Sequence, residues 1–242
     1  AATATIIAVG PLRTVDLGSL GTLQLGVAAW PLTLLWIVGM TNAFNFMDGI
    51  DGIAGITAAV AGVAVATAAA FLGVAPLAAV SLAFAGASIG FLTCNWPPAR
   101  IFMGDVGSAF CGFLIATLPL VPGAHASERL VPIMAVAMWP FIFDTVFTLG
   151  RRLRKGENIF EAHRSHLYQR LVIAGWPHRA VSMLYGFLSA ISASIAVAPL
   201  CGTASDRSAA TLSAATITVG AALLLLLVSG FAGHHNSVGG RG

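Results

Sequence analysis

The chain has 242 residues, of which 57% are hydrophobic and only 9% are charged, and its mean hydropathy is +0.89. Soluble domains carry about 25% charged residues, so this composition excludes an ordinary soluble domain. The net charge of +3 is small, and we expect no nucleic acid partner. Long apolar runs predict an all-α fold, a polytopic transmembrane helical bundle. We expect a single integral-membrane domain over residues 1–242.

Seven apolar segments are each long enough to be a full span, and a shorter apolar run, 1–12, precedes them. A polar, glycine-containing link over 11–26 leads into the first full span. The predicted spans are 29–47, 53–72, 75–93, 107–123, 130–149, 180–200 and 210–230. Because the first run resembles the second half of a helix, we expect that the N-terminal part of the domain precedes Ala1.

Positive charge is concentrated in the polar segment 150–179, which holds seven of the twelve Lys and Arg residues. Segments of this kind lie on the cytoplasmic side of a membrane. Two spans separate it from the polar loop 94–106, and two more separate that loop from the polar stretch 48–52. An even number of crossings returns the chain to the same side, so we expect all three segments to face the cytoplasm together.

The first of these segments, together with the end of the span before it, carries two amides and two carboxylates at intervals of three residues: Asn42, Asn45, Asp48 and Asp51. On one helical face this spacing makes the four side chains converge near the membrane surface. Either aspartate alone could simply cap the helix that follows. Carboxylates at membrane depth are costly and mark functional sites, so we expect these to form part of one.

Asp105 begins the span that follows the second loop, and it too could act only as a helix cap. By the alternation of spans it faces the same side as Asp48 and Asp51. A hard cation such as Mg²⁺ is bound by one or two carboxylates together with phosphate oxygens. The three carboxylates therefore favour a phosphate-bearing substrate that is handled beside a lipid.

The third segment contains His163, Arg164 and His166. The two histidines could form a zinc pair, but zinc's further soft ligands are missing nearby. Arginine offers a bidentate fork for phosphate oxygens, so the cluster suits a diphosphate or a sugar better. The basic run 151–155 is expected to anchor the topology. Asp144, at the end of the preceding span, has no assigned role, and a polar contact at a helix end explains it equally well.

Three motifs follow one another along the chain. They read Asn-x-x-Asn-x-x-Asp-Gly-x-Asp-Gly from Asn42, Asn-x-Pro-Pro-Ala with Phe-Met-Gly-Asp-Val-Gly-Ser from Asn95, and His-Arg-Ser-His-Leu-Tyr-Gln-Arg-Leu from His163. Together they resemble the polyprenyl-phosphate N-acetylhexosamine-1-phosphate transferases over essentially the whole chain. That family includes phospho-N-acetylmuramoyl-pentapeptide transferase and the enzymes that initiate O-antigen, common-antigen and teichoic acid synthesis.

The resemblance implies a phosphoglycosyl transferase of the bacterial plasma membrane, with Mg²⁺, or Mn²⁺ in its place, as cofactor. The implied reaction moves a sugar 1-phosphate from UDP-N-acetylhexosamine to undecaprenyl (polyprenyl) phosphate and releases UMP. The lipid bilayer is a further partner, and a homodimer is compatible with this family.

The resemblance also implies roles for individual residues. The implied catalytic residues are Asp48, Asp51 and Asp105, with Asp105 and Asp48 at the metal. Asn42 and Asn45 hold the nucleotide sugar, Asn95 and Phe102 recognise the uridine, and His163, Arg164 and His166 contact the sugar and diphosphate.

The chain departs from the family pattern at two points. The family has an Asp-Asp pair on a loop before the helix that here begins at Ala1, and we expect that pair upstream. Many members also carry His-His where this chain has Tyr168-Gln169. That variant looks more like the O-antigen branch that uses modified sugars such as N-acetylfucosamine.

A transporter or channel with a carboxylate-lined path is the alternative function. It predicts acidic residues near mid-span and broken helices related by internal symmetry. Here the acidic residues fall at predicted helix ends, and no inverted repeat is visible in the sequence. A membrane scaffold, the third option, would gain nothing from paired aspartates.

Overall fold

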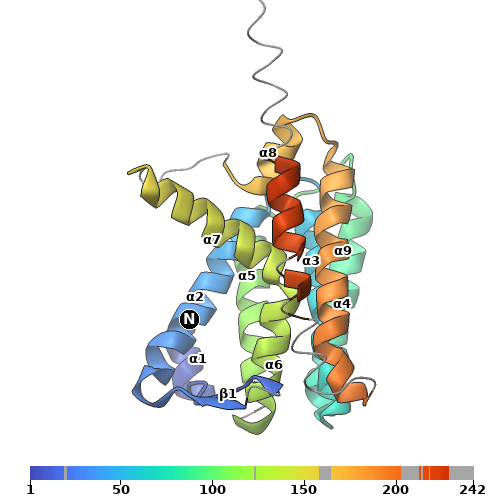
Figure 1. The fold of residues 1–242 in the computed structure, drawn as a ribbon. Coiled ribbons are helices and arrows are strands. Elements are labelled where there is room, and N and C mark those ends of the chain that lie inside the picture. Colours follow the sequence, from blue (N-terminus) through green and yellow to red (C-terminus); the bar gives the residue numbers. More distant parts are fainter. Residues whose placement is uncertain are drawn as a thin grey trace, which may run out of the picture.

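Helices form nearly all of the regular structure (Figure 1). The computed structural model describes residues 1–18, 21–122, 124–157, 165–202, 213, 215–217 and 219–228. The labelled helices are α1 (Ala2–Val9), α2 (Ala29–Met47), α3 (Ile53–Phe71), α4 (Ala75–Asn95), α5 (Gly104–Thr117), α6 (Ala124–Ala137), α7 (Trp139–Arg154), α8 (Leu167–Ile173) and α9 (His178–Val197). Two short antiparallel strands, β1 (Thr14–Asp16) and β2 (Thr22–Gln24), accompany them. The all-α class is confirmed.

Among the described residues, four helices are long and apolar enough to cross a membrane, which confirms a polytopic bundle. They are Gly26–Met47, Ile53–Phe71, Ala75–Asn95 and His178–Cys201. Two shorter apolar helices, Gly104–Leu120 and Ala215–Val228, fall where the sequence predicts the spans 107–123 and 210–230.

The predicted span 130–149 is not one straight helix. It is divided between α6 and α7, whose axes differ by 68° at a break around Met138. Pro140 lies in the first turn of α7. A proline there cannot donate to the carbonyl four residues earlier and its ring clashes with it, so the helix ends and restarts. The Trp139 indole N–H donates to the Ser192 hydroxyl of α9 and fixes the break against the bundle.

Helix α3 occupies the middle of the bundle, next to α4 and α9 (Figure 1). The buried share of its span is 72%, against 22% for α4. Its buried positions are mostly alanine and glycine. Small residues allow helix backbones to approach closely, which is how helices pack in lipid. The closest approach is at Gly62, where a Cβ atom would lie 2.9 Å from the Ser81 carbonyl oxygen and the Ala85 amide nitrogen of α4.

The three polar segments meet at one end of the bundle, as the alternation of the spans predicts. The Gly52 amide donates to the Asn95 side chain, which joins the first segment to the second. The Tyr168 hydroxyl donates to the Phe46 carbonyl, which joins the third segment to the end of α2. Figure 1 places α8 at this end and β1 at the other. That this end faces the cytoplasm stays a prediction.

The link predicted over 11–26 forms a hairpin at the opposite end in its described residues. Strands β1 and β2 pair with Val15 opposite Leu23. The hairpin is attached to α6 by an ion pair of 3.0 Å between Asp16 and Arg129, and by a hydrogen bond from Thr14 to Glu128. These charged groups lie at the opposite end from the polar segments.

The close approach at Gly62 gives a stability prediction. Gly62→Ala should lower the unfolding temperature in detergent, because the new methyl group meets backbone atoms of α4 that cannot move separately; overpacking of this kind costs about 1–3 kcal/mol. The matched control is Gly86→Ala in α4, where nothing lies within 4 Å of the added Cβ. Equal unfolding temperatures for the two variants would contradict this packing.

Candidate functional site

The turn between α2 and α3 carries the first carboxylates of the site. Helix α2 ends at Met47, and Asp48 is its C-cap residue, so the predicted continuous helical face from Asn42 to Asp51 is wrong beyond Asn45. The helix stops because the chain turns through Gly49 to Gly52, and Gly52, with a φ of +83°, is the N-cap of α3. No side chain caps α3, so neither aspartate serves as its helix cap.

Asp48 and Asp105 approach each other across α2 and α5. Burial, and next the charge of Asp105, raise the pKa of Asp48 from 3.8 to about 7. Asp105 is exposed in the first turn of α5, where a negative charge interacts favourably with the helix dipole. One turn away, the Asn45 amide donates to the Ser108 hydroxyl at 2.7 Å and holds the two helices in register. The two carboxylates are thus close enough for the charge of Asp105 to act on Asp48.

Asp51 has a different surrounding. Its Oδ2 accepts a hydrogen bond from the Ala99 amide at 3.1 Å and lies 3.5 Å from Nδ1 of His178 in α9. Its backbone carbonyl accepts from the Ser182 hydroxyl of the same helix at 2.8 Å. These contacts connect the first polar segment to the second and to α9. The structure therefore places Asp51 as a link between segments, beside rather than within the pair formed by Asp48 and Asp105.

Asn95 orders the second polar segment. Its side chain is 3% exposed, accepts from Gly52 at 2.9 Å and donates to the Ile101 carbonyl at 2.8 Å. The loop that it closes presents Phe102, whose side chain is 75% exposed. A large aromatic ring that is left uncovered beside two carboxylates is available to stack on a planar ligand. Asn42 is exposed on α2, one turn before Asn45.

His166 enters the site from the third segment. Its ring lies 6.2 Å from that of Phe46, centroid to centroid, next to the end of α2. Helix α8 follows it directly, and Gly49 is required there because a Cβ atom would overlap the Tyr168 hydroxyl. His163 and Arg164 lie outside the described residues.

The described residues contain no group of three or more His, Cys, Asp or Glu side chains arranged to hold a metal ion. A zinc site of the closed, four-ligand kind is therefore not present among them. A magnesium ion needs only one or two carboxylates and takes its other ligands from water and phosphate. Asp48 and Asp105 fit that requirement.

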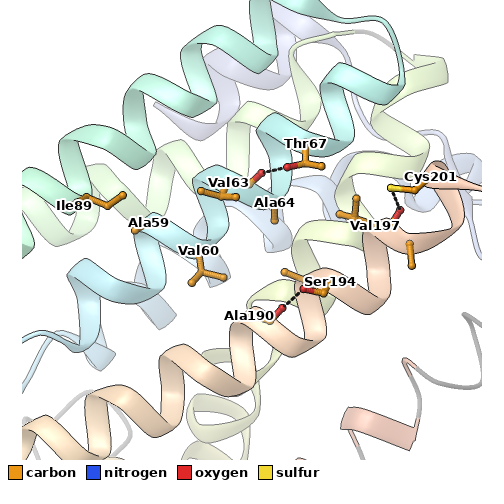
Figure 2. A pocket seen from close by; sticks show the side chains of 12 residues that line it. Ala59, Val60, Val63, Ala64, Thr67, Ile89, Ala190, Ser194, Val197 and Cys201 are labelled. Atoms are coloured by element: carbon orange, nitrogen blue, oxygen red, sulfur yellow. Dashed lines mark hydrogen bonds between the residues drawn. The ribbon is translucent and has the colours of Figure 1, made fainter. Parts of the chain in front are cut away.

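An apolar cavity of about 550 Å³ lies between α3 and α9 (Figure 2). Its lining is apolar, and its polar side chains bond within their own helices. Thr67 donates to Val63, Ser194 to Ala190, and Cys201 to Val197. The cavity therefore offers no group that would recognise a charged ligand.

Sequence reasoning missed four residues that shape the site: Ser108, Tyr168, His178 and Ser182. Each acts through a partner far away in the chain. Ser108 and Tyr168 lie within the motifs quoted from the sequence but received no role there, and no local pattern marks His178 or Ser182. Asp144 did stand out, as a carboxylate in an apolar segment, but its partners could not be read from the sequence. All five donors that it binds come from α7, the start of α8, and α9.

The model of glycosyl transferase family 4 matches residues 1–122, half of the chain. Among relatives, a protein of Bacillus subtilis (strain 168) named "Probable undecaprenyl-phosphate N-acetylglucosaminyl 1-phosphate transferase" is 38% identical over 175 residues, which cover 70% of this chain and 49% of that protein. A phospho-N-acetylmuramoyl-pentapeptide-transferase of Heliobacterium modesticaldum is 37% identical over 71% of this chain and 52% of its own length. A decaprenyl-phosphate N-acetylglucosaminephosphotransferase of Mycobacterium tuberculosis (strain ATCC 25618 / H37Rv) is 31% identical over 89% and 59%. The chain thus spans about half the length of the curated relatives that it matches.

The raised pKa of Asp48 predicts a pH-dependent stability. Folding disfavours the charged form of Asp48, so ionisation of this carboxylate lowers the free energy of unfolding. The effect is absent below about pH 3.8, where the carboxylate is protonated in both states, and is complete above about pH 7, where it is charged in both. Asp48→Asn removes this effect. In detergent with EDTA, the unfolding temperature of the variant should exceed that of the wild type by a margin that widens from pH 4 to pH 7. A margin that is constant over this range would contradict the raised pKa of Asp48.

Proposed function

The chain belongs to glycosyl transferase family 4, and on this premise we propose that the full-length protein is a phosphoglycosyl transferase. It transfers an N-acetylhexosamine 1-phosphate from a UDP-sugar to a polyprenyl phosphate, on the cytoplasmic face of the bacterial plasma membrane. The observation that carries the proposal is the meeting of Asp48 and Asp105 at the end of the bundle where the three polar segments join. The family assignment disfavours the transporter and scaffold alternatives.

The reaction exchanges one phosphoanhydride for another. An oxygen of the lipid phosphate attacks the phosphorus that carries the sugar, and a new P–O–P bond forms. The bond between that phosphorus and the bridging oxygen of the UDP-sugar breaks, and UMP leaves with the bridging oxygen. All participants are anions, so catalysis depends on offsetting negative charge and on alignment.

Asp48 and Asp105 are the residues that would hold Mg²⁺ or Mn²⁺. The charge of Asp105 adds to the cost of ionising Asp48, and a divalent ion held by the two residues would offset that cost. The ion supplies positive charge to the diphosphate when it is bound. The remaining ligands are provided by substrate and water, which matches the preference of magnesium for few protein ligands.

The other residues of the site bind and orient the substrates. Phe102, exposed on the second loop, stacks on the uracil. Asn42 and Asn45 extend from α2 toward the nucleotide sugar, and Asp51 holds the loops that surround it. His163, Arg164 and His166 bind the sugar and diphosphate, and the Arg164 guanidinium complements the phosphate oxygens. The names of the relatives agree with N-acetylhexosamine 1-phosphate derivatives as the transferred group.

If Asp48 and Asp105 hold the metal, removing the charge of either one should reduce transfer activity. Asp48→Asn and Asp105→Asn should each lower the transfer of labelled sugar phosphate from a UDP-sugar to polyprenyl phosphate by about 100-fold or more, because charge compensation at the diphosphate is lost. The control is Asp16→Asn, at the opposite end of the bundle, which should retain activity. Normal activity of Asp105→Asn would overturn the assignment, as would an equal loss in all three variants.

If Phe102 stacks on the uracil, removing its ring should weaken binding of the UDP-sugar. Phe102→Ala should raise the KM for the UDP-sugar by about tenfold, because stacking of a base on an aromatic ring contributes about 1–3 kcal/mol. The KM for polyprenyl phosphate should not change. Phe110→Ala is the matched control, since Phe110 is also exposed but lies further along α5. A change confined to the lipid substrate would instead place Phe102 at the acceptor.

A further inference from the structure

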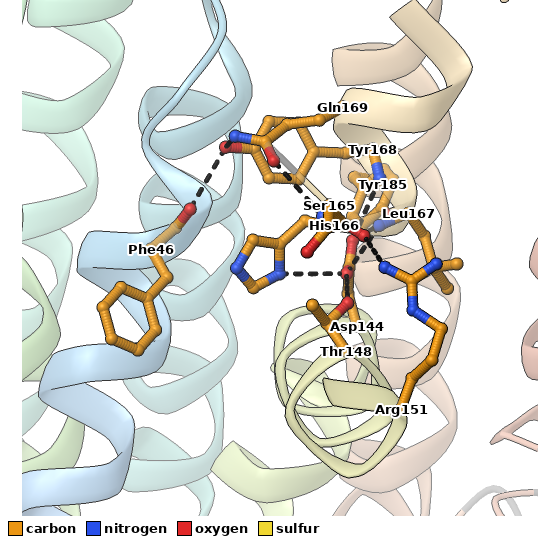
Figure 3. A network of polar contacts seen from close by, with 10 residues as sticks. All are labelled: Phe46, Asp144, Thr148, Arg151, Ser165, His166, Leu167, Tyr168, Gln169 and Tyr185. Atoms are coloured by element: carbon orange, nitrogen blue, oxygen red, sulfur yellow. Dashed lines mark hydrogen bonds and ion pairs between the residues drawn. The ribbon is translucent and has the colours of Figure 1, made fainter. Parts of the chain in front are cut away.

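Asp144 of α7 is the most completely bonded side chain in the described structure. Its carboxylate is 0% exposed and contacts five donors (Figure 3). Oδ1 accepts from the Leu167 amide at 2.8 Å, the Thr148 hydroxyl at 3.2 Å and Nδ1 of His166 at 3.1 Å. Oδ2 accepts from the Tyr168 amide at 3.0 Å and the Tyr185 hydroxyl at 2.7 Å. A polar contact at a helix end, the role considered from the sequence, describes only part of this arrangement.

A buried carboxylate is costly unless it is hydrogen-bonded on both oxygens, and an apolar residue at the same place would avoid that cost. Two of the donors are the first backbone amides of α8, so the carboxylate holds the start of that helix. Tyr185 comes from α9. Asp144 therefore joins α7, α8 and α9 at one point.

The contact with the His166 ring distinguishes the surroundings of Asp144 from a simple helix cap. Because the carboxylate accepts at Nδ1 of His166, the ring carries its proton there, and the hydrogen bond fixes both the tautomer and the ring orientation. Figure 3 shows the other ring nitrogen turned away from Asp144, on the side of Phe46. Phe46 lies two residues before Asp48, so that nitrogen is directed toward the end of α2 that bears the site.

The backbone around His166 is held as firmly as its ring. The Arg151 guanidinium donates to the Ser165 carbonyl at 2.7 Å, and the His166 amide donates to the Gln169 side chain at 3.2 Å. Gln169 in turn donates to the Tyr168 hydroxyl, which donates to the Phe46 carbonyl. Burial raises the pKa of Tyr168 above its ordinary value, so the phenol remains a donor at neutral pH. These contacts fix α8 against α2.

We propose that Asp144 is a positioning residue that holds His166 in the Nδ1-protonated tautomer and presents the lone pair of Nε2 to a hydrogen-bond donor on the sugar of the substrate. The inference deepens the proposed function and rests on it for the identity of the ligand. Asp144 does not touch substrate. It acts through His166, as a carboxylate behind a histidine does when it sets ring orientation and basicity.

The test is a double-mutant cycle on the full-length protein with a UDP-sugar and polyprenyl phosphate. Asp144→Asn should lower kcat by about 10–100-fold, the range for loss of a group that orients a functional histidine. The KM for polyprenyl phosphate should not change. In a His166→Ala background, Asp144→Asn should cause no further loss of kcat, because two residues that act as a unit are not additive.

Tyr185→Phe is the matched control, because it removes a donor to the same carboxylate without touching His166. It should lower the unfolding temperature in detergent about as much as Asp144→Asn, yet leave kcat within about threefold of the wild type, as expected for a contact outside the functional pair. If Asp144→Asn lowers kcat by the same factor with and without His166, the residue is only structural and the proposal is wrong. Equal losses of kcat in Asp144→Asn and Tyr185→Phe would lead to the same conclusion.

A second readout does not depend on the proposed function. In protein with ¹⁵N-labelled histidine, the ring signal that disappears in His166→Ala should report a proton on Nδ1. In Asp144→Asn this signal should shift to the other tautomer or to an exchanging mixture. An unchanged tautomer would overturn the positioning role. Absence of any transfer activity in the wild type, with the tautomer as predicted, would instead refute the proposed function.

Discussion

Within a bilayer the backbone cannot leave a helix without losing hydrogen bonds that no water replaces, so loops and polar side chains are confined to the ends of spans. This constraint determines where a site can form here. The turn 48–52, the loop 96–103 and the start of α8 come together because the helices between them carry the chain away and back. The Gly52–Asn95 and Tyr168–Phe46 hydrogen bonds then join the segments. The central α3, with its small residues, allows the ends of its neighbours to approach closely.

Aspartate serves three purposes at this end of the bundle, and the surroundings decide which. The pKa of Asp48 is raised by burial and by the charge of Asp105, which makes the two carboxylates suited to a cation. Asp51 shares a carboxylate oxygen between a loop amide and His178, and so connects segments. Asp144 is fully enclosed by five donors and controls a histidine. In each case a charge within or beside the membrane is retained where specific partners give it a role.

Hydropathy and the alternation of spans predicted most of the long helices and the meeting of the polar segments at one end, but not the short helix α8. They also predicted that Asp48 and Asp105 lie on the same side, because two spans separate them and an even number of crossings returns the chain to its starting side. The break between α6 and α7 was missed, since composition alone does not separate a span that contains Pro132 and Pro140 from a straight one. The helical spacing from Asn42 to Asp51 failed because α2 ends at Met47. The role of Asp144 depends on partners between 4 and 41 residues away, which a local pattern cannot reveal.

The central claim is that one site, built from three segments of the chain, holds a metal and a nucleotide sugar between α2 and α5. The most direct measurement is an electron cryomicroscopy structure of the full-length protein with Mn²⁺ and a UDP-sugar. The account predicts cation density between the Asp48 and Asp105 carboxylates, with the uracil against Phe102. Nucleotide density in the α3–α9 cavity or beside the hairpin, with nothing between the two carboxylates, would contradict it.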